Sequence, residues 1–280
     1  GKLSACDPIS VSKAAWALTS VPNRDRRLDF FAHLAVPVVL RAEVFPLGAL
    51  TMTAYAFAKA DHRDSDTYEA LSAALMRHPD EELRPVDVCN VVWAFCTVGY
   101  RDDDLFTRLC ESHLAKVDVA ANYNPQDITN TTWGFSKVLF VHVPAMDSLA
   151  LAALQQREKF RPIHFSNLFY SFATLSLRGP EGFLGTMAEA ALDRIGHFDS
   201  GNLAIAAWAL ARLREEHPLL TMVAEISRQP DVCAKLTSRA LSMLFLSFFQ
   251  LGRSRDLDAL FEASLGRVSI GASGFSALVM

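Results

Sequence analysis

The sequence repeats itself about every 38 residues, and this period constrains the fold more than any other feature. Each copy has one anchor position, which is aromatic in the first six copies, and successive anchors lie 37–40 residues apart. The residue after the anchor is always small, and the next one is always large and apolar. The anchors are Trp16, Tyr55, Trp93, Trp133, Tyr170, Trp208 and Leu246. A period of this length is typical of stacked helical repeats.

Apolar residues recur at intervals of three and four within each copy, which predicts two amphipathic helices per copy. Four copies have a proline eight residues before the anchor, where it suits a first helical turn. Asn124 is a candidate N-cap, and Gly99 and Gly252 suit helix exits. Neighbouring copies must stack, because one helix pair cannot bury both of its apolar faces. We therefore predict an all-α fold, namely a right-handed α-solenoid of about seven two-helix repeats of 37–40 residues.

We expect a single solenoid domain over residues 1–280. Neither end resembles a polar cap, so we expect more chain or a partner to cover at least one end. The chain begins with Gly1 rather than Met, which fits a removed targeting peptide, a tag remnant or a disordered leader. The predicted repeats are residues 6–44, 45–82, 83–122, 123–159, 160–197, 198–235 and 236–269, and residues 270–280 begin a further unit.

Two polar positions fall side by side on the first helix, on the side away from the apolar positions. The residue four after the anchor is polar in all seven copies, and the residue three before it is Asn in three consecutive copies. Helical-repeat RNA readers present such side chains to successive bases, and aromatic anchors beside them offer stacking surfaces. The predicted RNA-binding residues are Lys13, Lys59, Asn90, Asn130, Lys137, Asn167, Arg212 and Arg214.

Three other interpretations of these positions stay open. The anchors are more often packing side chains between repeats than platforms for bases. The asparagines would equally well satisfy backbone groups inside the array, and the polar positions would equally well form a solvated helix edge.

The charge pattern limits how RNA could bind. The net charge is −4, and the predicted repeats carry between −4 and +2 each. Phosphate binding generally uses clustered Lys and Arg, and the densest cluster is Arg24, Arg26 and Arg27. We therefore expect local RNA contacts rather than a continuous basic groove.

The sequence offers no catalytic motif. It has no glycine-rich phosphate loop, no zinc-binding HExxH and no G-x-S-x-G elbow, and its eight histidines are scattered. Five cysteines without paired spacing indicate no disulfide framework, and we interpret Cys89 and Cys96 as packing residues. We predict no enzyme activity, no catalytic residue, no metal and no cofactor. No apolar stretch reaches about 18 residues, so we also predict no membrane insertion.

Three segments resemble the repeats of a known class of organellar RNA-binding proteins. Leu83 to Gly99, Tyr123 to Val138 and Phe160 to Leu175 are similar to the helical repeats of octotricopeptide and heptatricopeptide proteins, which often accompany RAP and FAST-kinase-like regions. The resemblance covers nearly the whole chain. It implies mitochondrial or chloroplast proteins that stabilise, process or assemble organellar RNA, including parts of divergent mitochondrial ribosomes.

We therefore expect a non-catalytic protein that contacts organellar RNA as a component or assembly factor of a mitochondrial ribonucleoprotein, such as a divergent mitoribosome. The expected partners are organellar RNA, ribosomal RNA above all, and protein subunits of a large complex. The expected location is the mitochondrial matrix, with the chloroplast as the alternative. The alternative function is a protein–protein scaffold in a large organellar complex without RNA contact.

Overall fold

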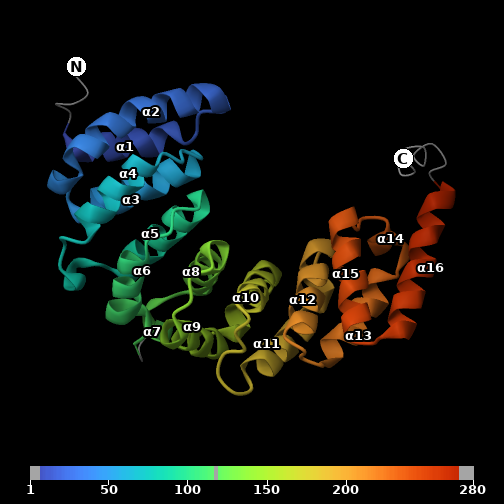
Figure 1. Cartoon of the computed structure of the whole chain (residues 1–280). Coiled ribbons are helices and arrows are strands. Elements are labelled where there is room, and N and C mark those ends of the chain that lie inside the picture. The colour runs from blue at the N-terminus through green and yellow to red at the C-terminus, as the bar shows by residue number, and fades with distance from the viewer. Residues whose placement is uncertain (1–6, 117–118, 271–280) are drawn as a thin grey trace. The chain divides into compact units, whose positions relative to one another are not determined.

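The computed structural model describes residues 7–116 and 119–270, and this part of the chain is helical and contains no β-strand (Figure 1). The predicted all-α repeat fold is confirmed. None of the described helices is both long and apolar enough to cross a membrane. The chain divides into two compact units, residues 1–152 and 153–280, which we describe separately. The predicted handedness, repeat limits and single domain stay predictions.

In the first unit, the first helices of successive repeats pack side by side in chain order (Figure 1). They are α1 (Pro8–Leu18), α3 (Leu47–Lys59), α5 (Pro85–Val98) and α8 (Pro125–Val138). The second helices form the other layer. They are α2 (Arg24–Arg41), α4 (Ser65–Leu75), α6 (Asp103–Leu109) and α9 (Val143–Gln155), with a π-helical turn Cys110–Leu114 after α6, a short α7 (Val119–Asn122) and 3-10 turns Ala42–Val44 and Asp80–Glu82.

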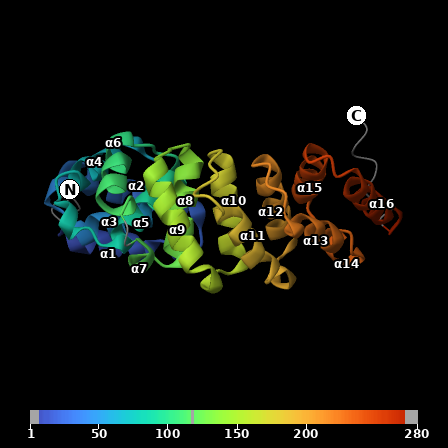
Figure 2. The same ribbon diagram turned by 90° about the horizontal axis from the view of Figure 1, so that it is seen from below.

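The second unit repeats this arrangement (Figure 2). Its first helices are α10 (Pro162–Thr174), α12 (Ser200–Arg212) and α15 (Ser238–Gln250). Its second helices are α11 (Phe183–Leu192), α13 (Pro218–Ser227) and α16 (Ser254–Ile270), with a short α14 (Pro230–Cys233) and 3-10 turns Arg157–Lys159 and Ile195–His197.

The residues that follow each anchor explain the packing. The large apolar residue two after the anchor is fully buried in repeats two to seven, as Phe57, Phe95 and Phe135 illustrate. The small residue one after the anchor lets neighbouring first helices approach closely. A Cβ atom added to Gly134 would lie 3.2 Å from Cγ1 of Val92 on the preceding first helix, which is tighter than ordinary contact. The small residue is therefore a packing requirement.

Polar side chains also join one repeat to the next. Thr51 Oγ1 on α3 donates to Asp87 Oδ1 on α5 at 3.1 Å, and Ser166 Oγ on α10 donates to Asn202 Oδ1 on α12 at 2.8 Å. All four residues are buried. Buried polar groups need such partners, so these bonds satisfy them and fix the register between neighbouring first helices.

Arginines in the turns connect repeats in a second way. Arg24 pairs with Asp61 at 2.7 Å, and Arg101 Nη1 donates to the carbonyl oxygen of Leu139 at 3.1 Å. Arg178 likewise donates to the carbonyl oxygen of Leu213. Each arginine thus reaches the end of the first helix in the following repeat, where carbonyls lack helical partners. These basic residues have a structural role.

The first helices of repeats two to seven share one exit. The residue six after the anchor is left-handed in all six: Asp61, Gly99, Leu139, Ser176, Arg214 and Gly252. The next residue donates its N–H to the carbonyl of the large apolar residue, as Tyr100 does to Phe95, which is a Schellman-type end. Gly99 and Gly252 confirm the predicted exits, and four other residues adopt the same geometry against their intrinsic preference.

The first turns of the first helices are capped as the sequence indicates. Asn124 accepts from the N–H groups of Gln126 and Asp127, which confirms it as an N-cap. Asp87 occupies the third helical position of α5 and accepts from the Arg84 N–H. In α10 the same position holds His164, which is 5% exposed and accepts through Nδ1 from the Arg161 N–H at 3.2 Å.

Apolar side chains are exposed on the first and last repeats. Val36 and Leu40 of α2 are exposed, and so are Phe249 of α15 and Phe261 of α16. Phe249 occupies a position that holds a small residue in every earlier repeat, and it is 72% exposed. We predicted that a further unit begins at residue 270. Ile270 is still part of α16, and residues 271–280 lie outside the described residues.

The shared exit predicts opposite effects for two substitutions in the first unit. Leu139 is 60% exposed and has φ +54°, a left-handed conformation that strains a leucine backbone. Leu139→Gly removes this strain with little loss of buried surface, so it should raise the free energy of unfolding by about 0.5–1 kcal/mol. Gly99→Ala, at φ +83°, should destabilise by about 1 kcal/mol. Thermal unfolding measures both, and equal shifts of the same sign would contradict the shared exit.

The cap at His164 predicts a pH dependence. Burial, with a smaller effect from Arg161, lowers the pKa of His164 below its ordinary value of 6.5. The unfolded chain therefore takes up this proton first, so the free energy of unfolding is highest above about pH 6.5 and falls as the pH drops below it.

The variant His164→Asp places at this position the residue type that α5 has there, Asp87, and removes the protonation of the histidine. We expect the melting temperature of the wild type to fall relative to the variant on acidification. Burial also lowers the pKa values of His62 and His113. Both histidines are present in the wild type and in the variant, so their effect cancels in the difference between the two melting temperatures. A pH-independent difference would refute the assignment.

Candidate nucleic-acid interface

Within each unit, rings of neighbouring anchors lie against each other on the side of the first helices that faces away from the second helices. In the first unit the ring centroids of Trp16 and Tyr55 lie 5.7 Å apart, and those of Tyr55 and Trp93 lie 4.7 Å apart. In the second unit Tyr170 and Trp208 lie 5.4 Å apart. The rings thus pack between repeats, as the more common interpretation of such anchors holds. They remain partly accessible, and Trp16 is 47% exposed.

Cations lie over three of these rings. Lys59 Nζ is 4.9 Å from the ring centroid of Trp16, and Lys137 Nζ is 5.5 Å from that of Trp133. The guanidinium of Arg212 is 5.8 Å from the Trp208 centroid, and its Nε donates to the carbonyl oxygen of Ala173 at 2.8 Å. All three side chains are exposed rather than buried between repeats. They stand at the position four after the anchor.

Charge is distributed unevenly between the two helix layers. The seven first helices carry five Lys or Arg side chains, and none of them forms an ion pair with a described carboxylate: Lys13, Lys59, Lys137, Arg212 and Arg239. Their two carboxylates, Asp87 and Asp127, are both engaged in capping. The acidic residues otherwise lie in second helices and turns. In each unit, we call the side of the first helices that faces away from the second helices the first-helix face. This face is therefore locally cationic on an acidic chain.

A groove crosses the first-helix face of the first unit. Its volume is about 490 Å³, and it runs over α1, α3, α5 and α8. Trp16, Met52 and Tyr55 give it apolar surface, and the amides of Asn90 and Asn130 line it. The two asparagines that the sequence places in adjacent repeats thus share one concave surface.

The amides are available for further hydrogen bonds. Asn130 Oδ1 accepts from Gln126 Nε2 at 2.6 Å, which leaves the Asn130 amino group free. Within the described residues, the side chains of Asn90 and of Asn167, on α10 of the second unit, have no hydrogen-bond partner. They are half-buried and do not satisfy backbone groups, so that alternative interpretation of the asparagines is wrong.

The remaining predicted residues lie in two places. Lys13 is exposed on α1 and belongs to the first-helix face. Arg214 follows α12 in the turn, with φ +52°, and lies off this face. The sequence analysis missed Gln126 and Arg239, which stand seven before their anchors, at about 20° from the anchor direction. The residue type at that position varies too much between repeats to form a pattern. Its angle of about 20° from the anchor nevertheless places it beside the anchor on the helix.

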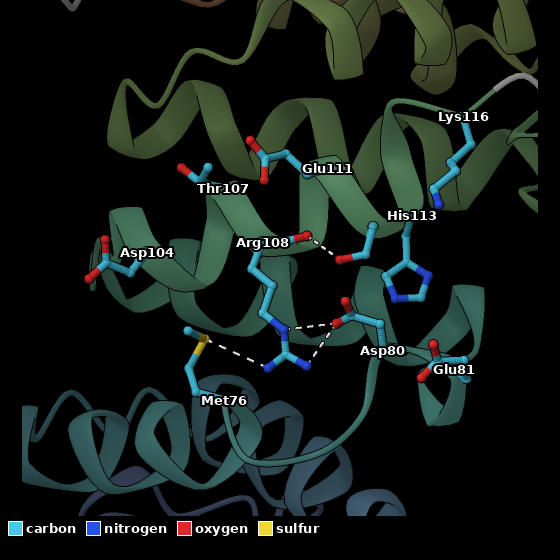
Figure 3. A pocket seen from close by; sticks show the side chains of 10 residues that line it. Met76, Asp80, Glu81, Asp104, Thr107, Arg108, Glu111, His113 and Lys116 are labelled. Atoms are coloured by element: carbon cyan, nitrogen blue, oxygen red, sulfur yellow. Dashed lines mark hydrogen bonds and ion pairs between the residues drawn. The ribbon is translucent and has the colours of Figure 1, made fainter.

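A larger concavity of about 750 Å³ lies beside α4, α6 and the π-helical turn (Figure 3). Arg108 crosses it and pairs with Asp80 (Figure 3). Arg108 also donates to the carbonyl oxygen of His78. The rest of the lining holds the carboxylates of Glu81, Asp104 and Glu111 against one lysine, Lys116, and is acidic on balance. The guanidinium is thus already neutralised by its own chain, and the surroundings disfavour a phosphate.

The described residues contain no group of three or more His, Cys, Asp or Glu side chains that could hold a metal ion. Burial raises the pKa of Cys89 and Cys96, and raises that of Cys110 to about 12, so these thiols are protonated at neutral pH. The absence of enzyme activity stays a prediction.

Comparison with known proteins gives two matches. Residues 14–253 match the family described as RNA-editing substrate-binding complex 6 protein. A 100-residue stretch is 28% identical to a chloroplastic RAP domain-containing protein of Oryza sativa subsp. japonica. That stretch covers 35% of this chain and 16% of the rice protein, so the similarity concerns a small part of the relative.

Proposed function

We propose that this chain, which belongs to the RNA-editing substrate-binding complex 6 protein family, is a non-catalytic subunit that contacts RNA in an organellar RNA-processing assembly. The family description names an RNA-editing complex that binds its substrate, which favours an RNA-processing assembly over the ribosome suggested by the resemblance of the repeats. The chloroplastic rice relative supports an organellar location. Within that, we propose the mitochondrial matrix, with the chloroplast as the alternative.

The observation that carries this proposal is the unpaired cationic charge on the first-helix face. Three arginines in the turns, Arg24, Arg101 and Arg178, are neutralised by carboxylates or occupied by helix carbonyls, so they have little capacity left for phosphate. Lys59 and Lys137 have no carboxylate within 4.0 Å and are held over aromatic rings. An ordered, exposed ammonium group attracts phosphate and releases counterions on binding.

The proposed contact combines two terms. Phosphates approach Lys59 and Lys137 near the C-terminal ends of α3 and α8, and bases reach the ring edges and amides beside them. Base stacking on aromatic side chains adds affinity with little sequence preference. The five cations lie on five different first helices, so each would make its own separate phosphate contact. This agrees with the expectation of local RNA contacts instead of a continuous basic groove.

Reversing two of these cations should weaken RNA binding. In the double variant Lys59→Glu and Lys137→Glu, we expect affinity for single-stranded RNA to fall by about tenfold or more at low salt. The slope of log affinity against log salt should also become shallower by about 1.4, since about 0.7 is lost per phosphate on a single strand. Fluorescence anisotropy over a salt series measures both quantities.

The matched control is Lys116→Glu with Lys159→Glu. Both lysines are exposed and lie off the first helices, and the two double variants have the same net charge. The control should bind RNA nearly as the wild type does. Equal losses in both double variants would mean that only overall charge matters, and unchanged binding in the first would overturn the proposed face.

The alternative is a protein scaffold, which the exposed apolar side chains of α2, α15 and α16 favour. Large exposed apolar patches often mark protein-binding surfaces. Nuclease treatment of the purified native assembly separates the two functions. RNA-mediated partners should be lost with the RNA, and retention of every partner after complete digestion would favour the scaffold over the proposal.

A further inference from the structure

We infer that the groove over α3, α5 and α8 takes unpaired bases of single-stranded RNA, and that Asn90 and Asn130 select the same base at two successive positions. This inference rests on the proposed RNA contact and specifies what the groove recognises. It is argued from the first unit alone, to which every residue of the groove belongs.

The two asparagines are structurally equivalent. Each stands three residues before the anchor of its repeat, and α5 and α8 pack directly against each other. Packed helices lie about 8–10 Å apart, whereas stacked bases on one strand are about 3.4 Å apart. One base per repeat therefore requires bases that are splayed out of a stack, which a single strand allows and a duplex does not.

The amides supply the discriminating chemistry. Asn presents a hydrogen-bond donor group and an acceptor side by side, so it can pair with a base edge through two bonds. The Asn90 amide has no partner within the described chain. Gln126 occupies one lone pair of Asn130 Oδ1 and holds that side chain in place, while the amino group and a second lone pair remain. Identical groups in equivalent positions favour identical bases.

The groove suits a base better than a phosphate. Its lining contains the carboxylates of Asp87 and Asp127 and one guanidinium, that of Arg84, which already pairs with Asp87 at 2.7 Å. A phosphate would therefore find no unpaired cation among the lining residues and would meet net negative charge. The apolar surface of Met52 and Tyr55 offers contact to the flat face of a base. Lys59 lies seven residues beyond Met52 on α3, about 10 Å along the helix, and its Nζ stands over the Trp16 ring at the edge of the groove. A phosphate held at Lys59 therefore leaves the asparagine end of the groove to bases.

On α3 the position of the two asparagines is occupied by Met52, which has no amide. It occupies the equivalent position on α3, lines the same groove and is 38% exposed. The variant Met52→Asn therefore adds a third identical amide next to Asn90 without emptying the core. The variant Asn130→Ala removes one of the two natural readers.

The test measures binding to short homopolymeric oligoribonucleotides of adenosine, cytidine and uridine by fluorescence anisotropy. The wild type should prefer one of them. Met52→Asn should raise that same preference by about fivefold or more, and Asn130→Ala should lower it by a similar factor. The control Ala73→Asn adds an amide on the exposed side of α4 and should leave the preference unchanged. Thermal unfolding verifies that each variant is folded.

Three results would overturn the inference. They are equal binding of all three homopolymers by the wild type, no gain of preference in folded Met52→Asn, or a gain for a different base. Each of these leaves RNA binding itself intact, so the proposed function survives. Failure of the wild type to bind any RNA would instead overturn the proposed function, and this inference with it.

Discussion

The close approach of neighbouring first helices is the constraint on which the rest of the structure depends. The small residue after each anchor permits it, and at Gly134 even a methyl group would crowd Val92. Between α3 and α5 the same close packing brings the rings of Tyr55 and Trp93 to 4.7 Å and lets Thr51 donate a buried hydrogen bond to Asp87. The same approach aligns equivalent surface positions from repeat to repeat. A row of equivalent side chains, and hence any row of contacts to a polymer, follows from that packing.

The division of charge between the two layers explains how an acidic chain can still offer a cationic face. Arg24, Arg101 and Arg178 hold the turns together and are neutralised or occupied there. Lys59 and Lys137 lie over rings and have no carboxylate partner. The net charge of a repeat adds the paired arginines to the unpaired lysines and subtracts the carboxylates of the second helices. The unpaired lysines therefore do not show in that sum. Their different partners become visible only when the helices are separated.

Much of the fold could be predicted from the sequence because it depends on local, repeated chemistry. The cap at Asn124 and the exits at Gly99 and Gly252 follow from residue types with strong backbone preferences. The exits at Leu139 and Ser176 could not be predicted, because both residues disfavour the left-handed conformation that they adopt there. The π-helical turn after α6 has no local signature either.

The candidate site shows the same limit. The regular spacing of Asn90 and Asn130 predicted two equivalent side chains, and the structure brings both into one groove. Gln126 was missed because the residue seven before the anchor ranges from glycine and apolar residues to Gln and Arg, which forms no pattern. Arg214 was included because it is basic and near an anchor, but the helix has already ended there.

Helix stability itself gives the first-helix face a direction. Capping carboxylates such as Asp87 and Asp127 favour the positive ends of the first helices, and Lys59, Lys137 and Arg212 favour the negative ends. Helix N-termini commonly bind phosphate, but in α5 and α8 the chain's own carboxylates already occupy that place. An RNA strand bound as we propose would therefore meet cations at one end of these helices and amides toward the other. The carboxylates and cations that stabilise the two ends of the first helices thus also separate the proposed phosphate contacts from the proposed base contacts.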